Sequence, residues 1–305
     1  MKFQFLLINH APQDWHLLSD LLRPILDGLM ECGHSSEVSM SNFEPGSAHL
    51  FLEYFVDPRA AELLRMLQQS GVPLGLVLTE DVAELQQNPC NRARWNGLQE
   101  VFRYFSFFWS MDRVDSYWPF VPKEKIKRLT LGSYETPRFN FQKRRHFPPR
   151  LDFLFYGRET ELRLTWKSAL DSLGHTAAFS IMTLDGGGVY AMPDYMTESA
   201  LGSAAVLLDV ARGPEVTMAS PSRLAFALQH ALPIITDFNF DLSGTIYDGY
   251  VERARLQDVL QRSHFYLSPE FAAVTTRRSA EWRDRFRMRD LLQEPLSIVP
   301  QAPQR

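Results

Sequence analysis

Short apolar runs alternate with amphipathic stretches along almost the whole chain, and this alternation limits the possible folds more than any other feature. A short apolar run between turn signals is typical of a buried strand. Apolar residues spaced three and four apart are typical of a helix that packs on one face. Because elements of these two kinds in alternation form parallel sheets covered by helices, the sequence predicts an α/β fold.

The pattern runs through the first half of the chain and then restarts. In the first half, the predicted strands cover residues 3–8, 37–40, 49–56, 73–79 and 105–111, and the predicted helices cover 15–30, 58–69 and 93–104. In the second half, the predicted strands cover 151–156, 177–182, 204–210 and 233–236, and the predicted helices cover 161–173, 221–231, 256–262 and 275–293. The restart predicts two Rossmann-like domains.

Length and proline content indicate where the domains divide. A chain of 305 residues exceeds one average domain. Five of its 19 prolines fall between residues 119 and 149, which is typical of a crossing between domains. We expect a first domain over residues 1–133, a linker over 134–150 and a second domain over 151–274, followed by a helix over 275–294 that can cross back and a flexible tail over 295–305.

Composition excludes several classes of protein. The net charge of −4 argues against a nucleic-acid binder, which would show a strongly basic face. Cys32 and Cys90 are too few for a disulfide framework and suit a reducing compartment. Residues 1–10 predict a first strand rather than a signal peptide, and no segment approaches the ~20 apolar residues of a membrane span. We therefore expect a cytoplasmic protein without a transmembrane segment.

Common cofactor and catalytic motifs are missing from the sequence. Residues 9–16, after the first predicted strand, lack the glycine-rich turn of dinucleotide-binding proteins. No His or Cys pair has the spacing of metal ligands, and no Gly-x-Ser-x-Gly nucleophile motif occurs. We expect neither a bound cofactor nor a metal.

One segment, Ser220–Asp237, combines signals that suit an anion site. It follows a buried-type strand and a polar loop, and Ser220 and Pro221 are typical of the cap and first position of a helix. Ser222 and Arg223 then fall in the first turn, where free amides and the helix dipole favour an anion. Arg223 is also suited to gripping phosphate oxygens. An ordinary capped helix with a surface arginine explains the same pattern, so both interpretations stay open.

Several motifs follow one another in a fixed order along the second half of the chain: Leu129–Gly132, Pro137–Phe139, Leu154–Arg158, Ser220–Asp237, Leu256–Leu260 and Trp282–Leu292. This order resembles the second half of GT-B glycosyltransferases, and the spore-maturation-protein-like branch of the group-1-like enzymes is most similar. The resemblance covers residues 129 to 292. It implies two Rossmann-like domains that face each other across a cleft.

The resemblance also implies a function and a donor site. It implies transfer of a sugar from a nucleotide-diphosphate donor, without metal, to an acceptor held by the first domain. That acceptor is unidentified: a glycan, a protein or a small molecule. The positions carried over for donor binding are Gly157, Arg158, Ser222 and Arg223. The chain departs from the family at Phe226, where the family has a glutamate that contacts the donor.

Residues at the ends of predicted strands in the first half are candidates for activating the acceptor. His10 follows the first strand, and His16 lies a little further on. Glu80 and Asp81 close the strand over 73–79. Strand ends border ligand clefts in open α/β sheets, and imidazole or carboxylate can act as a general base. Structural or solvated side chains are the alternative for each of these residues.

Two other functions fit the same architecture. Phe226 cannot accept a hydrogen bond from a hydroxyl, which favours a glycosyltransferase-derived binding or scaffold protein that has lost turnover. A nucleotide-sugar epimerase or phosphorylase would share the fold as well.

Overall fold

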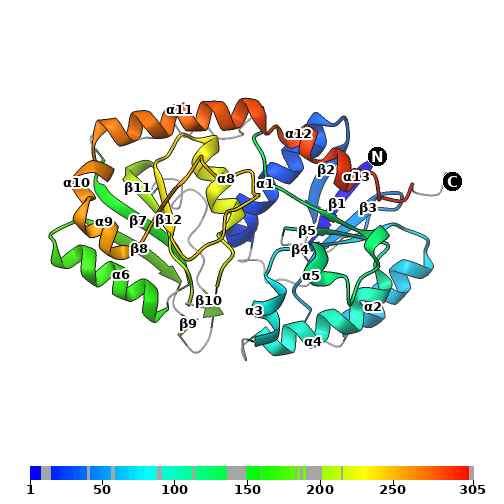
Figure 1. Cartoon of the computed structure of the whole chain (residues 1–305). Helices are drawn as coiled ribbons and strands as arrows, with labels where there is room; N and C mark the ends of the chain where they lie inside the picture. The colour runs from blue at the N-terminus through cyan, green and yellow to red at the C-terminus, as the bar shows by residue number, and fades with distance from the viewer. Residues whose placement is uncertain are drawn as a thin grey trace. The chain divides into compact units, whose positions relative to one another are not determined.

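The structure is a computed structural model. It describes residues 1–7, 15–39, 42–55, 59–87, 91–111, 114–135, 149–158, 160–182, 184–185, 188–189, 201–213 and 216–301. The chain forms two units, of which the first contains residues 1–15, 23–131 and 288–305 and the second contains residues 16–22 and 132–287. Figure 1 labels most of the elements of both units, and each unit is described by itself.

The first unit contains a parallel six-stranded sheet in the order β2-β1-β3-β4-β5-β6. Its strands are β1 (Lys2–Leu6), β2 (Ser35–Ser39), β3 (Ala48–Leu52), β4 (Leu74–Leu78), β5 (Phe107–Ser110) and β6 (Ile126–Arg128). Strand β1 pairs with both β2 and β3, so the order of the chain through the sheet reverses there. Every residue of β3 and β4 is buried, as expected for strands covered by helices on both faces.

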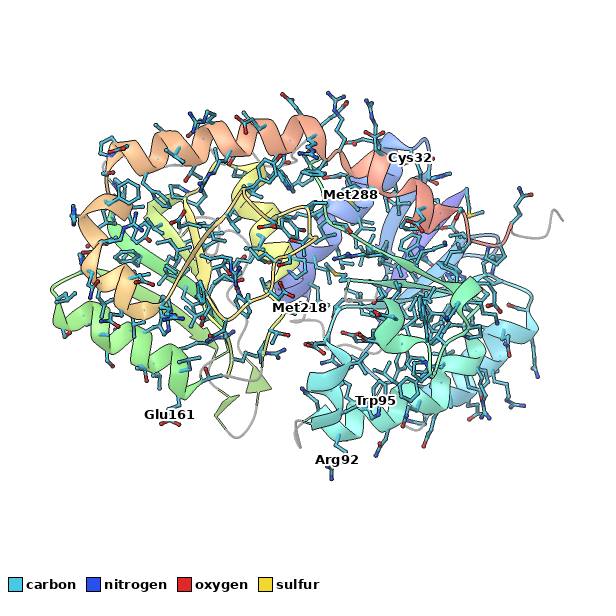
Figure 2. All side chains as sticks on the ribbon, viewed as in Figure 1. Cys32, Arg92, Trp95, Glu161, Met218 and Met288 are labelled. Atoms are coloured by element: carbon cyan, nitrogen blue, oxygen red, sulfur yellow. The ribbon has the colours of Figure 1, made fainter. Side chains whose placement is uncertain are left out.

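Helices connect these strands, and the helices of residues 59–101 pack an aromatic core against the sheet. The helices before β6 are α1 (Trp15–Glu31), α2 (Arg59–Gln69), α3 (Val82–Gln87), α4 (Arg92–Val101), the 3₁₀ turn η3 (Phe102–Tyr104), α5 (Val114–Tyr117) and the 3₁₀ turn η4 (Lys123–Lys125). Trp95 of α4, labelled in Figure 2, packs edge-on against Phe102 and Phe120. Phe105 contacts Phe51 and Phe108 in the same core.

The second unit contains a parallel five-stranded sheet in the order β13-β12-β11-β7-β8. Its strands are β7 (Leu151–Arg158), β8 (Ala177–Met182), β11 (Ala204–Asp209), β12 (Ile234–Asp237) and β13 (Glu252–Ala254), and a short antiparallel pair joins β9 (Leu184–Asp185) to β10 (Gly188–Val189). The chain moves outward from β7 to β8 on one side and from β11 to β13 on the other. The order therefore reverses between β7 and β11.

The helices of the second unit include α6 (Glu161–Ser172), α8 (Pro221–Gln229), α9 (Leu256–Gln261), α10 (Ser263–Tyr266) and α11 (Pro269–Arg285). Hydroxyl side chains cap the first and the last of these. The Thr160 hydroxyl accepts a hydrogen bond from the amide of Arg163, and the Ser268 hydroxyl accepts one from the amide of Phe271. Helix α11 runs along α8, where the Arg283 guanidinium donates to the carbonyl of Gln229 over 3.1 Å.

The end of the chain differs from the single helix expected over residues 275–293. Helix α11 starts earlier, because Ser268 caps it and Pro269 occupies its first position. It ends at Arg285, and two short helices follow, α12 (Met288–Leu291) and α13 (Gln293–Leu296). Within the expected flexible tail, Pro295 is buried in the first unit and its carbonyl accepts a hydrogen bond from the Trp109 indole over 2.9 Å. That part of the expectation is wrong, because the packing of Pro295 against β5 orders the segment.

Within the described part of the chain, no helix is both long and apolar enough to cross a membrane. Most of the linker expected over residues 134–150 lies outside the described residues.

Candidate functional site

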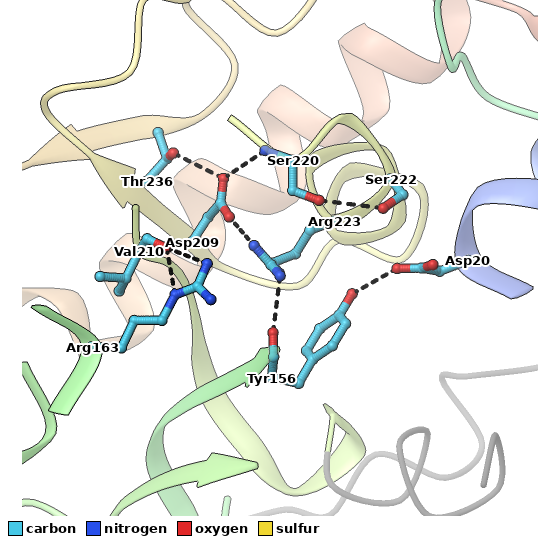
Figure 3. Close-up of polar contacts among 9 residues, drawn as sticks. All are labelled: Asp20, Tyr156, Arg163, Asp209, Val210, Ser220, Ser222, Arg223 and Thr236. Carbon is cyan, nitrogen blue, oxygen red and sulfur yellow. Dashed lines mark hydrogen bonds and ion pairs between the residues drawn. The ribbon is translucent and has the colours of Figure 1, made fainter. Parts of the chain in front are cut away.

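The sheet of the second unit provides a ligand-binding edge where β7 and β11 end. Because the chain order reverses between these two strands, the loops that leave them turn to opposite sides. A crevice of this kind at the carboxyl ends of the strands is where open α/β sheets bind ligands. Helix α8 begins at the same edge, twelve residues after the end of β11. Figure 3 shows the polar side chains gathered there.

Asp209, the last residue of β11, joins three elements at this edge. Its carboxylate accepts hydrogen bonds from the Ser220 amide over 3.2 Å and from the Thr236 hydroxyl over 3.3 Å. Its other oxygen pairs with the guanidinium of Arg223. Asp209 is only 1% exposed, so it holds the start of α8 against the sheet from inside the fold.

Arg223, in the first turn of α8, is an internal cation. It is 8% exposed, and it pairs through Nη1 with Asp209 and donates through Nη2 to the Tyr156 carbonyl over 2.9 Å. Its guanidinium also lies over the rings of Phe155 and Tyr156, 5.2 and 4.9 Å from their centroids. Burial is the largest single effect and opposes its charge, but Asp209, Tyr156 and Asp20 together outweigh it, and the pKa of Arg223 is raised above its ordinary value. A permanent positive charge is thus fixed at the N-terminus of α8.

Gly157 supplies the space that this arrangement needs. Its φ of +150° is a conformation that other residues rarely adopt. A Cβ atom there would lie 2.9 Å from the Phe155 ring and 3.4 Å from Nη2 of Arg223. The glycine therefore lets the end of β7 approach the guanidinium.

A second buried arginine supports the neighbouring loop. Arg163 of α6 donates two hydrogen bonds, of 3.1 and 3.0 Å, to the carbonyl of Val210, directly after β11. Its guanidinium lies 4.5 Å from the centroid of Phe155. The two arginines thus fix the chain at the ends of both strands that border the reversal.

Asp20 brings a carboxylate to the start of α8. It belongs to the first turns of α1, which are part of the second unit. Its carboxylate accepts hydrogen bonds from the Tyr156 hydroxyl over 3.2 Å and from the Ser222 hydroxyl, and it lies within the electrostatic influence of Arg223. Burial raises the pKa of Asp20, against the lowering effect of Arg223 and of these hydrogen bonds. The Tyr156 pKa is likewise raised, by burial first and by Asp20 second.

The chemistry of this edge suits an anion. A fixed arginine charge, two hydroxyl donors and the first amides of a helix converge at one place. In this structure the Asp20 carboxylate takes the hydroxyl donors. Another anion must displace this carboxylate or meet it in its protonated form.

Three of the residues expected to bind the donor come together at this edge: Gly157, Ser222 and Arg223. Arg158 is the last residue of β7, but its side chain lies outside the described residues. Ser222 lies 3.3 Å from the Ser220 hydroxyl, oxygen to oxygen.

The residues expected to activate the acceptor fall in other places. His10 lies outside the described residues, and the same holds for the side chain of His16 in α1. Glu80 and Asp81 follow β4 in the first unit, where Glu80 forms a 3.3 Å ion pair with Arg94. The structure shows that Glu80 is held by a partner, and it leaves the catalytic role of Glu80 and Asp81 a prediction.

Sequence reasoning missed Asp20 and Tyr156. Asp20 occupies a polar position in an otherwise ordinary amphipathic helix, and nothing in its neighbourhood in the sequence singles it out. Tyr156 directly precedes Gly157 and Arg158, which the sequence predicted to bind the donor. Phe226, the departure from the expected glutamate, packs on His230 with ring centroids 4.5 Å apart.

Within the described ranges, no three His, Cys, Asp or Glu side chains are grouped so that they could hold a metal ion. The basic and hydroxyl groups at the edge suit a substrate phosphate better than a cation, because the two carboxylates there are already paired with Arg223, Tyr156 and Ser222.

Comparison with known proteins bears on the fold. No protein-family model and no curated protein matches this chain. Among solved structures, the β-glucosyltransferase of phage T4 in complex with UDP-glucose matches 98% of this chain and 99% of its own, with a TM-score of 0.56 and 9% identity. HepE of Anabaena in complex with UDP and glucose matches 97% and 98%, with a TM-score of 0.58 and 11% identity. With two parallel α/β units and these matches along nearly its whole length, the chain has the GT-B fold of glycosyltransferases.

Proposed function

We propose that the protein is a glycosyltransferase that moves a sugar from a nucleotide-diphosphate donor to an acceptor hydroxyl. The observation that carries the proposal is the start of α8, with Ser222 and the buried Arg223 at the strand reversal of the second sheet. A diphosphate is the part of such a donor that this edge suits. The GT-B fold supports a uridine nucleotide as the first donor to test, because it is shared with the phage T4 β-glucosyltransferase, whose structure holds UDP-glucose, and with HepE, whose structure holds UDP and glucose.

Different residues provide positive charge and hydrogen bonds to the diphosphate. Both Nη atoms of Arg223 are engaged by Asp209 and Tyr156, so Arg223 acts through its charge rather than as a two-pronged ligand. The Ser222 hydroxyl and the first amides of α8 are the groups placed to donate hydrogen bonds to phosphate oxygens. When the bond between sugar and diphosphate breaks, negative charge grows on the leaving diphosphate. A fixed cation that is shielded from water stabilises that charge without reorganising.

We propose that this stabilisation needs no metal ion, because Arg223 and the helix start already supply positive potential. The assay for this point is UDP release from UDP-glucose with EDTA and with added Mn²⁺. Equal rates are expected, and a rate that depends on Mn²⁺ would contradict metal independence.

The acceptor stays open as to glycan, protein or small molecule. We propose that it is not a nucleic acid, because the chain carries a net charge of −4 and such partners are bound through basic surfaces.

Calorimetry with UDP, GDP, CDP and thymidine diphosphate tests the proposal. We expect saturable binding of at least one nucleotide, weakened by Ser222→Ala and by Arg223→Gln. Arg277→Gln is the matched control, since Arg277 lies exposed on α11 of the same unit. If none of the four nucleotides binds, the proposal is overturned. Binding of UDP with no release of UDP from UDP-glucose would instead favour a binding protein without turnover, the alternative that Phe226 suggests.

A further inference from the structure

Three charged side chains meet at the carboxyl ends of β3 and β4 in the first unit. Glu53 follows β3, Glu80 follows β4, and Arg94 lies in the first turns of α4. Both oxygens of Glu53 are engaged: one accepts from the Thr79 amide over 2.7 Å, and the other accepts from the Thr79 hydroxyl and from Nη2 of Arg94. Sequence reasoning selected Glu80 and missed both Glu53 and Arg94.

Arg94 links the two carboxylates in a defined orientation. Its Nε donates to the backbone carbonyl of Glu53 over 2.9 Å, and its Nη2 donates to the Glu53 carboxylate over 2.9 Å. The remaining arm, Nη1, reaches the Glu80 carboxylate over 3.3 Å. Glu53 therefore fixes the plane of the guanidinium, and the guanidinium in turn fixes Glu80.

The two carboxylates differ in their access to solvent. The Glu53 side chain is 2% exposed, whereas that of Glu80 is 20% exposed. The main chain of Glu80 is held as well, because its carbonyl accepts the Tyr117 hydroxyl over 2.8 Å. Glu80 can thus touch a substrate, and Glu53 acts only through Arg94.

The place of this cluster in the sheet favours a functional role. Strand order in the first unit reverses where β1 lies between β2 and β3, and Glu53 follows β3 at the edge where such sheets bind ligands. A carboxylate buried behind an arginine is a costly arrangement if it serves stability alone, because replacing such groups with apolar ones is often neutral or better.

We propose that Glu53 and Arg94 are positioning residues for Glu80, which accepts the proton of the acceptor hydroxyl in the proposed sugar transfer. This inference rests on the proposed function and goes beyond it by assigning the residues that orient the base.

The step balances as a direct displacement. The acceptor oxygen forms a bond to C1 of the donor sugar while the bond from C1 to the diphosphate oxygen breaks. The electron pair of the broken bond leaves with the diphosphate. The acceptor proton passes to the Glu80 carboxylate, and no further reactant is needed.

The ionisation of Glu53 predicts a pH dependence of activity that can be measured. Burial raises the pKa of Glu53 to about 7, against the lowering effect of Arg94 and with a further rise from Glu80. Arg94 and Glu80 are the charged groups that face it among the described residues. As Glu53 ionises, Arg94 shares its charge between two carboxylates, so less of that charge opposes proton transfer to Glu80. Activity is therefore expected to rise as the pH passes through 7.

The experiment compares Glu53→Gln and Arg94→Lys with the wild type. Glu100→Gln and Arg92→Lys are matched controls, because both residues lie exposed on α4; Arg92 is labelled in Figure 2. Folding is checked by urea unfolding. The readouts are the pH dependence of kcat/KM for release of UDP from UDP-glucose, with water as acceptor, and the titration of the Glu80 carboxyl carbon followed by NMR.

We expect kcat/KM of the wild type to rise about tenfold across pH 7 and to lose this rise in Glu53→Gln. Arg94→Lys is expected to lower kcat by about tenfold with little change in KM, since lysine cannot bridge two carboxylates as a planar fork. The Glu80 titration is expected to shift in Glu53→Gln and to stay unchanged in both controls.

The possible outcomes distinguish a failure of the positioning role from a failure of the proposed transferase activity. If UDP is released but the pH profile and the Glu80 titration are the same in Glu53→Gln as in the wild type, the positioning role is overturned and the transferase proposal stands. If the wild type binds UDP by calorimetry but releases none from UDP-glucose, both the positioning role and the transferase activity are overturned.

Discussion

Asp20 is the residue expected to oppose the proposed binding of a diphosphate at the start of α8. Its carboxylate takes the hydroxyls of Tyr156 and Ser222, which the diphosphate would otherwise use. Asp20→Asn removes the negative charge and keeps the size of the side chain. We expect the variant to bind UDP about threefold to tenfold more tightly at pH 7, as measured by calorimetry.

The pH dependence of that gain gives a sharper test. Burial raises the pKa of Asp20, so the wild type loses this negative charge earlier than usual as the pH falls. The advantage of Asp20→Asn should therefore shrink as the pH falls. Comparing the two proteins at each pH cancels the titration of the nucleotide itself. Glu161→Gln, an exposed change at the start of α6 (Figure 2), should leave UDP affinity unchanged at every pH. A gain that is constant with pH would show that the charge of Asp20 is not what competes.

Asp209 is expected to matter for folding as much as for binding. Asp209→Asn keeps the shape of the side chain but leaves the Arg223 guanidinium buried without its counter-charge. Breaking a buried pair in this way typically costs about 3 to 5 kcal/mol. Urea unfolding should show a loss of that size, compared with almost none for the exposed change Asp248→Asn. Equal stability in the two variants would mean that water reaches Arg223 and that the pair is not a structural anchor.

Among the secondary-structure elements, the end of β7 is shaped by Gly157. Gly157→Ala adds a Cβ atom 2.9 Å from the Phe155 ring in a backbone conformation that alanine avoids. Gly174→Ala is a matched control, because Gly174 also has a positive φ but no atom within 4 Å of its added Cβ. We expect Gly157→Ala to lose about 1 to 3 kcal/mol more in urea unfolding, the cost of overpacking. Equal losses would indicate that β7 relaxes around the new methyl group.

Helix starts are the elements that local sequence predicted well when their caps were used. Ser220 and Pro221 predicted a helix from residue 221, and α8 begins there. Ser268 and Pro269 carry the same signal and mark the start of α11, which apolar spacing alone places too late, at residue 275. The three-residue strands β6 and β13 were missed because three residues carry no measurable periodicity.

The candidate site was predictable only where its residues follow local rules. Gly157, Ser222 and Arg223 lie at a strand end and a helix start, where backbone geometry signals an anion site. Asp20 and Tyr156 are 136 residues apart in the chain, and only tertiary packing brings them together. The pairing of Arg223 with Asp209 is equally invisible to spacing, although it decides how Arg223 can act.

For the whole molecule, alternation of strands and helices was enough to predict two parallel sheets, but not the strand order within them. In each sheet the order in which the chain adds strands reverses once. That reversal marks the edge of the sheet at which a ligand is expected to bind. Periodicity cannot supply this order, because it depends on which strands pair. Strand pairing shows which candidate residues lie at the same edge of each sheet, and the sequence alone does not show this.

Folding stability as a function of pH should contain two opposing contributions from the first unit. His49 lies buried in β3, and burial lowers its pKa to about 4, against a slight rise from Glu44. The unfolded chain therefore binds a proton at His49 more readily, and this contribution to stability is lost as the pH falls from about 6.5 to 4. Burial raises the pKa of Glu53 to about 7, so its contribution is lost as the pH rises from about 4.5 to 7.

Each contribution amounts to about 3 kcal/mol, because a shift of one pKa unit corresponds to about 1.4 kcal/mol. Between pH 4.5 and 6.5 the contributions of His49 and Glu53 should nearly cancel in the wild type. Replacing one of the two residues should leave the pH dependence of the other visible. The stability difference between wild type and His49→Gln should fall toward low pH, whereas that between wild type and Glu53→Gln should fall toward neutral pH. Hydrogen exchange of β3 peptides in urea, at steps from pH 4 to 7.5, measures both differences in the unit concerned. The exposed change Glu62→Gln should give a flat difference. If the stability difference changes with pH in the same direction for both variants, one of these buried groups reaches solvent in the folded protein. The Glu53→Gln result then decides whether the link between Glu53 and Arg94 can respond to pH.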